Sequence, residues 1–208
     1  MHTYSVIVYK VSPVNLSELK YYASAGNTGY LGYYVNSSGT LHSSYQSGDL
    51  GRIAYLSSSD VEVYRSGSRI LILALSDLGG YYWKTAATTG DAAWNSTTAM
   101  NGMSFCASHQ SSTYPAAKAA WKANTISGTS YWFFPSIAQA TKMFPVAIKS
   151  GTGQLVAGRV YWTTTDSGTC GVHYAWRYGG ATHNNMFSWG GHSTGKATAF
   201  QIRQCCAY

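Results

Sequence analysis

The chain has 208 residues, 45% of them hydrophobic, and this length suffices to bury a core without disulfides or metals. Charged residues make up only 10%, against about 25% in average proteins, and the seven Asp and Glu residues offer little material for paired-carboxylate catalysis or hard-metal binding. The net charge of +7 arises because acids are scarce, and the basic residues are scattered rather than gathered in a stripe, which argues against nucleic-acid binding.

Tyr, Trp, Gly and hydroxyl or amide side chains take the place of charges. Such compositions are typical of extracellular β-rich modules and of recognition surfaces. The longest apolar run covers residues 70–75, far short of a membrane span, so we expect no membrane insertion. The start, MHTYSVIVYKVSP, lacks the basic n-region and long h-region of a signal peptide. We therefore expect either another export route or a trimmed chain.

The first part of the chain has the pattern of β-structure. Residues 3–11 are rich in β-branched and aromatic side chains, residues 29–35 precede a turn at 36–39, and residues 51–56 form another expected strand. The apolar run within residues 69–75 predicts a strand at the centre of a sheet.

Two helices are expected in the middle of the chain. Residues 114–124 place Pro115 where a first helical turn tolerates it and continue with good helix formers. Residues 135–144 form the second helix, with Ser136 as its N-cap, and Pro145 is expected to end or kink it.

The last third returns to β-structure, at residues 159–164, 174–176 and 197–206. Strands, then two helices, then strands predict an α+β domain whose helices pack on antiparallel sheets. We expect residues 1–47 to form an N-terminal β extension or small subdomain, and residues 48–208 to form the ligand-binding domain.

The four cysteines lack CxxC spacing, which argues against a structural zinc site. Cys205 and Cys206 are adjacent, and on a strand they point to opposite faces, which argues against a bridge between them. A bridge such as Cys106 to Cys170 stays open. Buried thiols that act as small apolar groups are the simpler interpretation.

Several short motifs recur along the chain in a particular order. After the strand GRIAY (51–55) they are ILALSDLG (72–79), YPAAKAAW (114–121), WFFPSIAQ (132–139), YWTTT (161–165), AW (175–176) and a final segment from Lys196 to Arg203. In this order they resemble the DUF1566-like (Lcl C-terminal) domain family over about residues 48–208. The resemblance implies a C-type lectin-like fold. It also implies a kinship with surface proteins and phage adhesins of gut bacteria, including ligand-binding proteins diversified by retroelements.

The chain departs from the family's pattern at three places. Gln204 stands where the family has Pro, Gln139 where an acid is usual, and Asp166 where Glu is usual. The calcium-dependent sugar-binding motifs of true C-type lectins are missing, since Trp94-Asn95-Ser96 stops short of Trp-Asn-Asp. We therefore expect no calcium-dependent glycan binding, no metal and no cofactor.

By resemblance, residues 166–199 form the exposed face of the domain. Trp176 belongs to a framework motif and is expected to be a core anchor. The rest of the segment combines rigid aromatic rings with adaptable hydrogen-bonding groups, as recognition surfaces do. The candidate ligand-binding residues are Tyr174, Arg177, Tyr178, His183, Asn184, Asn185, Phe187, Trp189 and His192.

The sequence also offers residues for two other kinds of site. A metal site could use Cys170, His173, His183 and His192, but their spacing is irregular and no carboxylate supports them. Formylglycine-generating enzymes share the C-type lectin fold and use two cysteines, but no base accompanies Cys205 and Cys206, and no Gly-x-Ser-x-Gly elbow occurs. We expect no enzyme activity.

The sequence thus predicts a non-enzymatic adhesin or receptor-binding protein of a phage tail or bacterial surface. Its ligand would be a host or cell-surface protein or glycan, and its location the virion surface or the cell exterior. It would form a homo-oligomer, a trimer if it is a virion protein. The alternative is a structural pilus or virion subunit. The Asn, Tyr, Ser and His residues of the exposed face are reachable by adenine mutation of Asn codons, so retroelement diversification is a further hypothesis.

Overall fold

The computed structural model describes residues 15–85, 92–123, 125–127, 131–147, 151–156, 159–166, 175–179, 187–189, 197 and 199–208, with only the backbone of 175–179 and 187–189. Within these ranges an eight-stranded sheet runs in the order β2-β1-β3-β4-β10-β7-β8-β9. Its strands are β1 (Tyr34–Asn36), β2 (Leu41–His42), β3 (Asp49–Leu56), β4 (Ile70–Tyr82), β7 (Val160–Asp166), β8 (Ala175–Gly179), β9 (Phe187–Trp189) and β10 (Ala199–Ala207). A second, two-stranded sheet joins β5 (Lys122–Ala123) to β6 (Tyr131–Trp132).

The helices of the described residues confirm the α+β class. They are α1 (Leu16–Ser24), α2 (Gly102–Ser108), α3 (Pro115–Ala120), α4 (Ile137–Ala147) and the 3₁₀ helix η1 (Ala92–Trp94). The prediction of antiparallel sheets is wrong at one place, because β10 lies antiparallel to β4 but parallel to β7. The sequence predicted two α-helices, which correspond to α3 and α4, and did not predict α1 and α2. The C-type lectin-like fold stays a prediction.

Strand β4 forms the centre of the core because it is apolar on both faces. Leu71 and Leu73 lie in a first core cluster, which also holds residues of α2, α3 and α4. Ile70 and Ile72 lie in a second core cluster with residues of α1, β1 and β2. The predicted central strand at 69–75 is therefore confirmed, and it continues to Tyr82.

The neighbouring strand β10 shows the same alternation at its two cysteines. Cys205 pairs with Leu73 and belongs to the first cluster, whereas Cys206 pairs with Ile72 and belongs to the second. Both side chains are fully buried. The prediction that they point to opposite faces of a strand is confirmed.

The N-terminal region combines a helix with strands that extend the large sheet. The strand expected at 3–11 lies outside the described residues, α1 is followed by β1 and β2, and β1 pairs with β3. Asn15 caps α1: its side chain accepts the N–H of Glu18, and the Glu18 carboxylate accepts the N–H of Asn15. Leu16 and Leu19 are buried in the second cluster, so this region packs on the large sheet.

The two predicted helices are present with different ends. Helix α3 begins at Pro115 as expected but stops at Ala120, because residues 122–123 pair with β6. Helix α4 runs through Pro145 to Ala147 rather than ending there. Ser136 Oγ accepts the N–H of Gln139 at 3.3 Å, which confirms its capping role.

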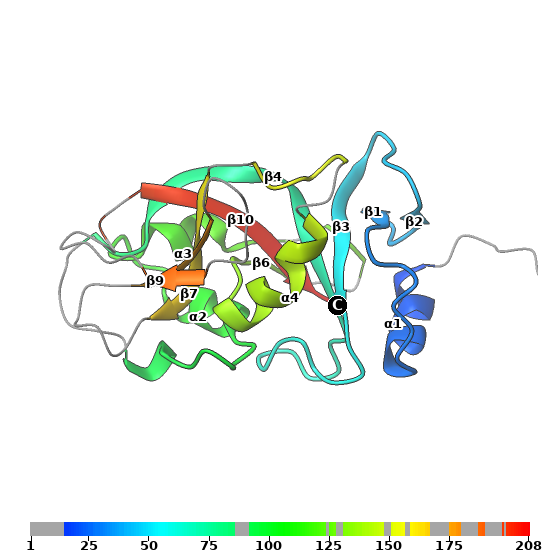
Figure 1. Cartoon of the computed structure of the whole chain (residues 1–208), viewed down its shortest axis with the longest axis horizontal. Helices are drawn as coiled ribbons and strands as arrows, with labels where there is room; N and C mark the ends of the chain where they lie inside the picture. Colours follow the sequence, from blue (N-terminus) through cyan, green and yellow to red (C-terminus); the bar gives the residue numbers. More distant parts are fainter. Residues whose placement is uncertain are drawn as a thin grey trace, which may run out of the picture.

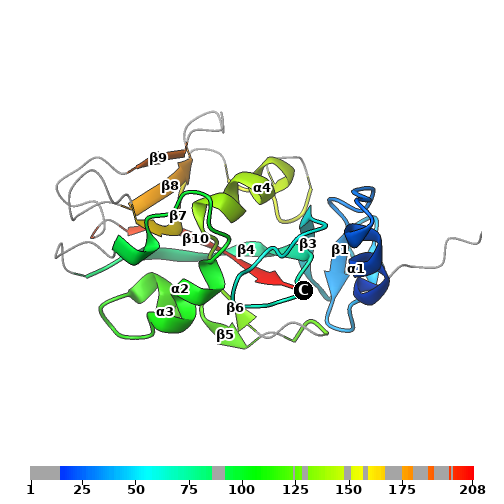
Figure 2. The ribbon, with the colours of Figure 1, turned by 90° about the horizontal axis from the view of Figure 1, so that it is seen from below.

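The molecule is elongated, with α1, β1 and β2 at one end and β7, β8 and β9 at the other (Figures 1 and 2). The end of β10 lies near the middle of the molecule (Figure 1), where it pairs with the start of β4. None of the described helices is long and apolar enough to cross a membrane.

Candidate functional site

The described part of the predicted ligand-binding segment forms β8 and β9, at one edge of the large sheet. Arg177 and Tyr178 are part of β8, and Phe187 and Trp189 are part of β9. The register pairs Tyr178 with Phe187 across these two strands. Figure 2 shows both strands at the end of the molecule remote from α1. The structure therefore brings four of the candidates together on two adjacent strands.

The other candidates cannot be placed. Tyr174, His183, Asn184, Asn185 and His192 lie outside the described residues. Trp176, the expected core anchor, pairs through its backbone with Trp189. Whether these side chains form one face stays a prediction.

Strand β7, which pairs with β8, is anchored in the core. Strand β7 pairs Tyr161 with Tyr178 and Trp162 with Arg177. Both Tyr161 and Trp162 are fully buried. Trp162 donates its indole N–H to the carbonyl of Tyr81 at 3.0 Å and its ring lies 4.6 Å from that of Phe200. The β8–β9 pair thus projects from a rigid support.

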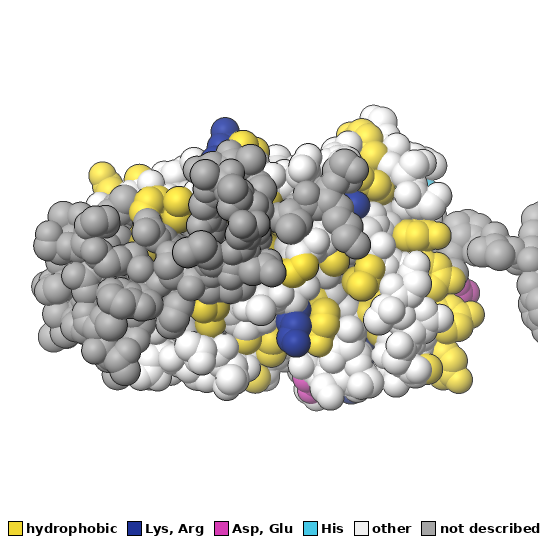
Figure 3. Space-filling model, in the orientation of Figure 1, with side chains coloured by type: hydrophobic (Ala, Val, Ile, Leu, Met, Phe, Trp, Pro, Cys, Tyr) yellow, Lys and Arg dark blue, Asp and Glu magenta, His cyan; other side chains and the backbone are white. Residues whose placement is uncertain are grey.

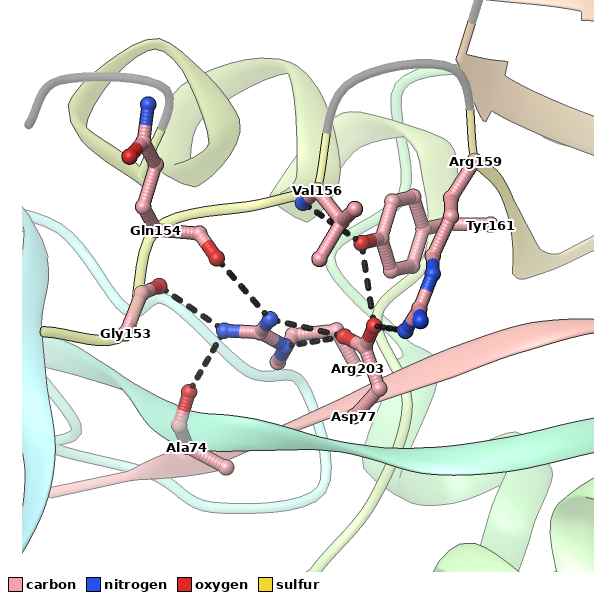
Figure 4. A network of polar contacts seen from close by, with 8 residues as sticks. All are labelled: Ala74, Asp77, Gly153, Gln154, Val156, Arg159, Tyr161 and Arg203. Atoms are coloured by element: carbon pink, nitrogen blue, oxygen red, sulfur yellow. Dashed lines mark hydrogen bonds and ion pairs between the residues drawn. The ribbon is translucent and has the colours of Figure 1, made fainter.

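A buried polar network joins β7 to the centre of the sheet (Figure 4). Arg203 on β10 and Asp77 on β4 form an ion pair with an N···O distance of 2.7 Å, and both side chains are nearly inaccessible to solvent. The second oxygen of Asp77 accepts a hydrogen bond from Arg159 at 2.7 Å and one from the Tyr161 hydroxyl at 3.2 Å. One carboxylate therefore ties β4, β10 and β7 together.

The same network fixes the segment 151–156 against the sheet. The Arg203 guanidinium donates to the carbonyls of Gly153 and Gln154, at 2.8 and 3.3 Å, and to that of Ala74 at 3.1 Å. The Tyr161 hydroxyl in turn accepts the N–H of Val156 at 3.0 Å. Burial raises the pKa of Tyr161, and the neighbouring Asp77 charge raises it further, so the phenol stays protonated and can donate.

A second buried carboxylate, Glu62, joins the loop after β3 to α2 and α4. It accepts hydrogen bonds from the N–H groups of Tyr64 and Met103, at 3.1 and 2.9 Å, and from the amide of Gln139 at 2.8 Å. Burial raises the pKa of Glu62 even though these hydrogen bonds lower it. Gln139, which departs from the family's pattern, is thus the partner of an acid.

The described thiols are poorly suited to nucleophilic chemistry. Cys106 and Cys205 are fully buried free cysteines, and burial raises the pKa of both thiols well above the ordinary range. A nucleophile needs the thiolate and access to substrate. No group of three metal-binding side chains occurs in the described part of the chain. Cys170, His173, His183 and His192, the alternative metal ligands, lie outside it.

Sequence reasoning missed that Asp77, Tyr161 and Arg203 form one unit. Each lies in a different motif of the resemblance, separated by 84 and 126 residues from Asp77. A signal was present: Asp77 follows the apolar run of β4, and a carboxylate beside a buried strand requires a cationic or hydrogen-bonding partner. These residues act as framework, and they support the candidate face without forming it.

No protein-family model matches this chain, and no curated protein matches it either. Among solved structures, the fold is similar to that of a fimbrial protein from Bacteroides ovatus, with a TM-score of 0.51 and 11% sequence identity. The match covers 86% of this chain and 48% of that protein. The chain thus spans about half the length of this structural relative, and the likeness is one of fold alone.

Proposed function

We propose that this chain is a non-enzymatic domain of a bacterial surface fibre, in which it serves as a structural subunit. The observation that carries the proposal is the similarity of its fold to a fimbrial protein over 86% of the chain. The surface is consistent with an extracellular setting: Figure 3 shows charged side chains only at scattered points of the described face. Hydroxyl and amide groups dominate the composition instead.

Immunogold labelling of cells that produce the protein would test this role. We expect antibodies against the chain to label fibres outside the cell along their length. Gold particles confined to the cell interior would overturn the proposal, whereas label at fibre tips alone would replace the structural role by an adhesive one.

An adhesin is the second candidate, because β8 and β9 bring Arg177, Tyr178, Phe187 and Trp189 together on the edge of the sheet. In this role the end of the molecule formed by β8 and β9 would bind a host protein or glycan. We expect Tyr178→Ala combined with Phe187→Ala to abolish binding to a glycan or surface-protein array and to leave the Tm within a few degrees. Unchanged binding would contradict this site, and so would global unfolding of the variant.

The resemblance to the DUF1566-like family supports a narrower form of the adhesin proposal. In that form the domain has a C-type lectin-like fold, is displayed on a virion or cell surface, and carries a C-terminal face diversified by a retroelement. A nearby template repeat and reverse transcriptase gene are then expected at the locus. If sequencing finds neither, diversification is excluded.

A further inference from the structure

A cleft on the side of the large sheet where α4 packs has no part in the framework or in the β8–β9 edge. It has a volume of about 450 Å³ and lies between the end of β3 with its following loop, residues 97–100, and α4. This volume falls within the range of about 300–1,000 Å³ that small-molecule sites occupy. Six hydroxyl-bearing residues line it: Tyr55, Ser57, Ser59, Thr97, Thr98 and Thr141.

A β-bulge places Tyr55 in this cleft. In β3, Ile53 pairs with Ile72 and Tyr55 with Leu71, which leaves Ala54 as the extra residue. Without the bulge, strand alternation would put Tyr55 on the same face as Ile53, toward α1. With it, Tyr55 packs against the first core cluster and faces α4 instead.

The walls of the cleft are tied to one another by hydrogen bonds. The N–H of Val63 donates to the carbonyl of Met100 at 2.9 Å. Ser136, just before α4, donates its hydroxyl to the carbonyl of Ala99 at 2.8 Å. Gln139 of α4 donates to the carbonyl of Val61 at 2.9 Å. The cleft is therefore preformed rather than a gap between independent segments.

The polar groups of the cleft are available to a ligand. The hydroxyls of Tyr55, Ser59 and Thr97 make no hydrogen bond to another residue in the part of the chain that the structure describes. Ser57 Oγ accepts the N–H of Ser59, which leaves its own O–H to donate. Thr141 donates its hydroxyl to the carbonyl of Ile137, which leaves its oxygen to accept. The lining hydroxyls thus offer both donors and acceptors to the cavity.

The lining of the cleft argues against a metal ion, a phosphate or a purely apolar molecule as its ligand. Asp60 is the single carboxylate among the lining residues, and its Oδ1 is bound to Arg69 and to the N–H of Gly67, whereas a hard-metal site needs several oxygen ligands. Lys142 is the single cation among the lining residues, whereas phosphate sites usually combine several donors or a helix N-terminus. A purely apolar ligand would leave the hydroxyls without partners.

From these features we propose that the cleft between β3 and α4 binds a short saccharide. Sugar hydroxyls both donate and accept hydrogen bonds, which matches the lining, and Met100, Ala138 and the Tyr55 ring offer apolar surface to the sugar's C–H groups. The proposal does not depend on assembly into a fibre or on the β8–β9 edge.

Calorimetric titration of the full chain with glucose, galactose, N-acetylglucosamine, lactose and glucuronate tests the proposal. At least one of these sugars is expected to bind with a Kd on the order of 1 mM or tighter. Tyr55→Phe, which removes one hydroxyl, should weaken that binding about tenfold. Ala138→Phe, which fills the cleft, should abolish it.

Tyr45→Phe is the matched control, since it removes a phenolic hydroxyl from an exposed tyrosine outside the cleft. It should leave sugar binding unchanged, and the Tm of all three variants should stay close to that of the wild type. The proposal is overturned if none of the five sugars binds, or if binding survives Ala138→Phe in a folded variant. Binding that Tyr45→Phe weakens as much as Tyr55→Phe would also overturn it.

Discussion

At the residue scale, the Asp77 carboxylate joins three other segments of the chain to β4. It accepts hydrogen bonds from Arg203 on β10, from the Tyr161 hydroxyl on β7, and from Arg159 just before β7. Removal of one partner from a buried pair leaves the other charge without compensation, which costs more than the pair itself contributes.

We predict that Asp77→Asn lowers the free energy of unfolding by about 3 kcal/mol, because the Arg203 guanidinium stays buried without its counter-charge. Urea unfolding of both proteins measures the change. Asp60→Asn is the control: its pair with Arg69 is partly exposed and should contribute about 1 kcal/mol or less. Equal effects of the two substitutions would show that the buried Asp77 network stabilises the fold no more than the partly exposed Asp60–Arg69 pair.

Glu62 makes the free energy of unfolding depend on pH, and the sign of this dependence follows from its raised pKa. Burial raises its pKa above the ordinary value of 4.5, so the folded chain holds this proton more tightly than the unfolded chain. The resulting stabilisation is complete below about pH 4.5 and is lost as the pH rises through the raised value.

Comparison with Glu62→Gln isolates this contribution, because the variant cannot titrate at this position. The unfolding free energy of the wild type, relative to that of the variant, is expected to fall as the pH rises above about 4.5. Chemical denaturation at a series of pH values measures both curves. Parallel curves would show that Glu62 has the same proton affinity in both states.

At the element scale, the packing of α2 against α4 depends on a glycine. A Cβ on Gly102 would lie 2.5 Å from Gln139 Oε1 and 2.7 Å from the carbonyl oxygen of Phe134. Gly102→Ala should therefore destabilise the protein by about 2–3 kcal/mol, measured by thermal or urea unfolding. Gly80→Ala on β4, whose Cβ would have only ordinary contacts, should change stability by less than about 1 kcal/mol; similar effects would refute the close approach.

Helices α1 and α2 show which elements the sequence could reveal. The capping box Asn15-Leu-Ser-Glu18 is a local sequence signal for the start of α1. Helix α2 carries no such signal: its cap makes no side-chain hydrogen bond, and Met103 instead donates to Glu62, 41 residues earlier. Strands β3 and β4 were predictable because their apolar pattern is local.

At the scale of the whole molecule, the two core clusters share the same central strands. Leu16 and Leu19 of α1 pack with Ile70 and Cys206 in the second cluster. The first cluster lies on the opposite face of the same strands, β4 and β10. Because of this sharing, we expect residues 1–47 to unfold together with the rest of the chain. Pairings such as the parallel contact of Gln201 with Tyr161 could not be predicted, since no local pattern specifies which distant strand becomes a neighbour.

We therefore predict one cooperative unfolding transition for the chain. Calorimetric and van't Hoff enthalpies should agree, and circular dichroism and tryptophan fluorescence should give the same midpoint. A separate transition at lower temperature, accompanied by fast hydrogen exchange across α1, β1 and β2 alone, would instead show that residues 1–47 form a small subdomain.

The candidate face could be assigned to a region from its residue types, but its geometry could not. Gly, Asn and His in a long segment permit many backbone conformations, and the sequence therefore did not predict that Phe187 would return to pair with Tyr178. The supporting network was equally hidden, because its members are brought together only by the pairing of β10 with β4 and β7.

The central position of β10 also sets the timing of folding during synthesis. Strand β4 emerges from the ribosome about 120 residues before the strand that pairs with its second edge. At translation speeds of about 5–20 residues per second, that interval lasts roughly 6–24 s. Throughout it, an apolar strand has an open edge able to pair with other nascent chains. The newly made protein should therefore depend on a holding chaperone until residues 199–207 are available.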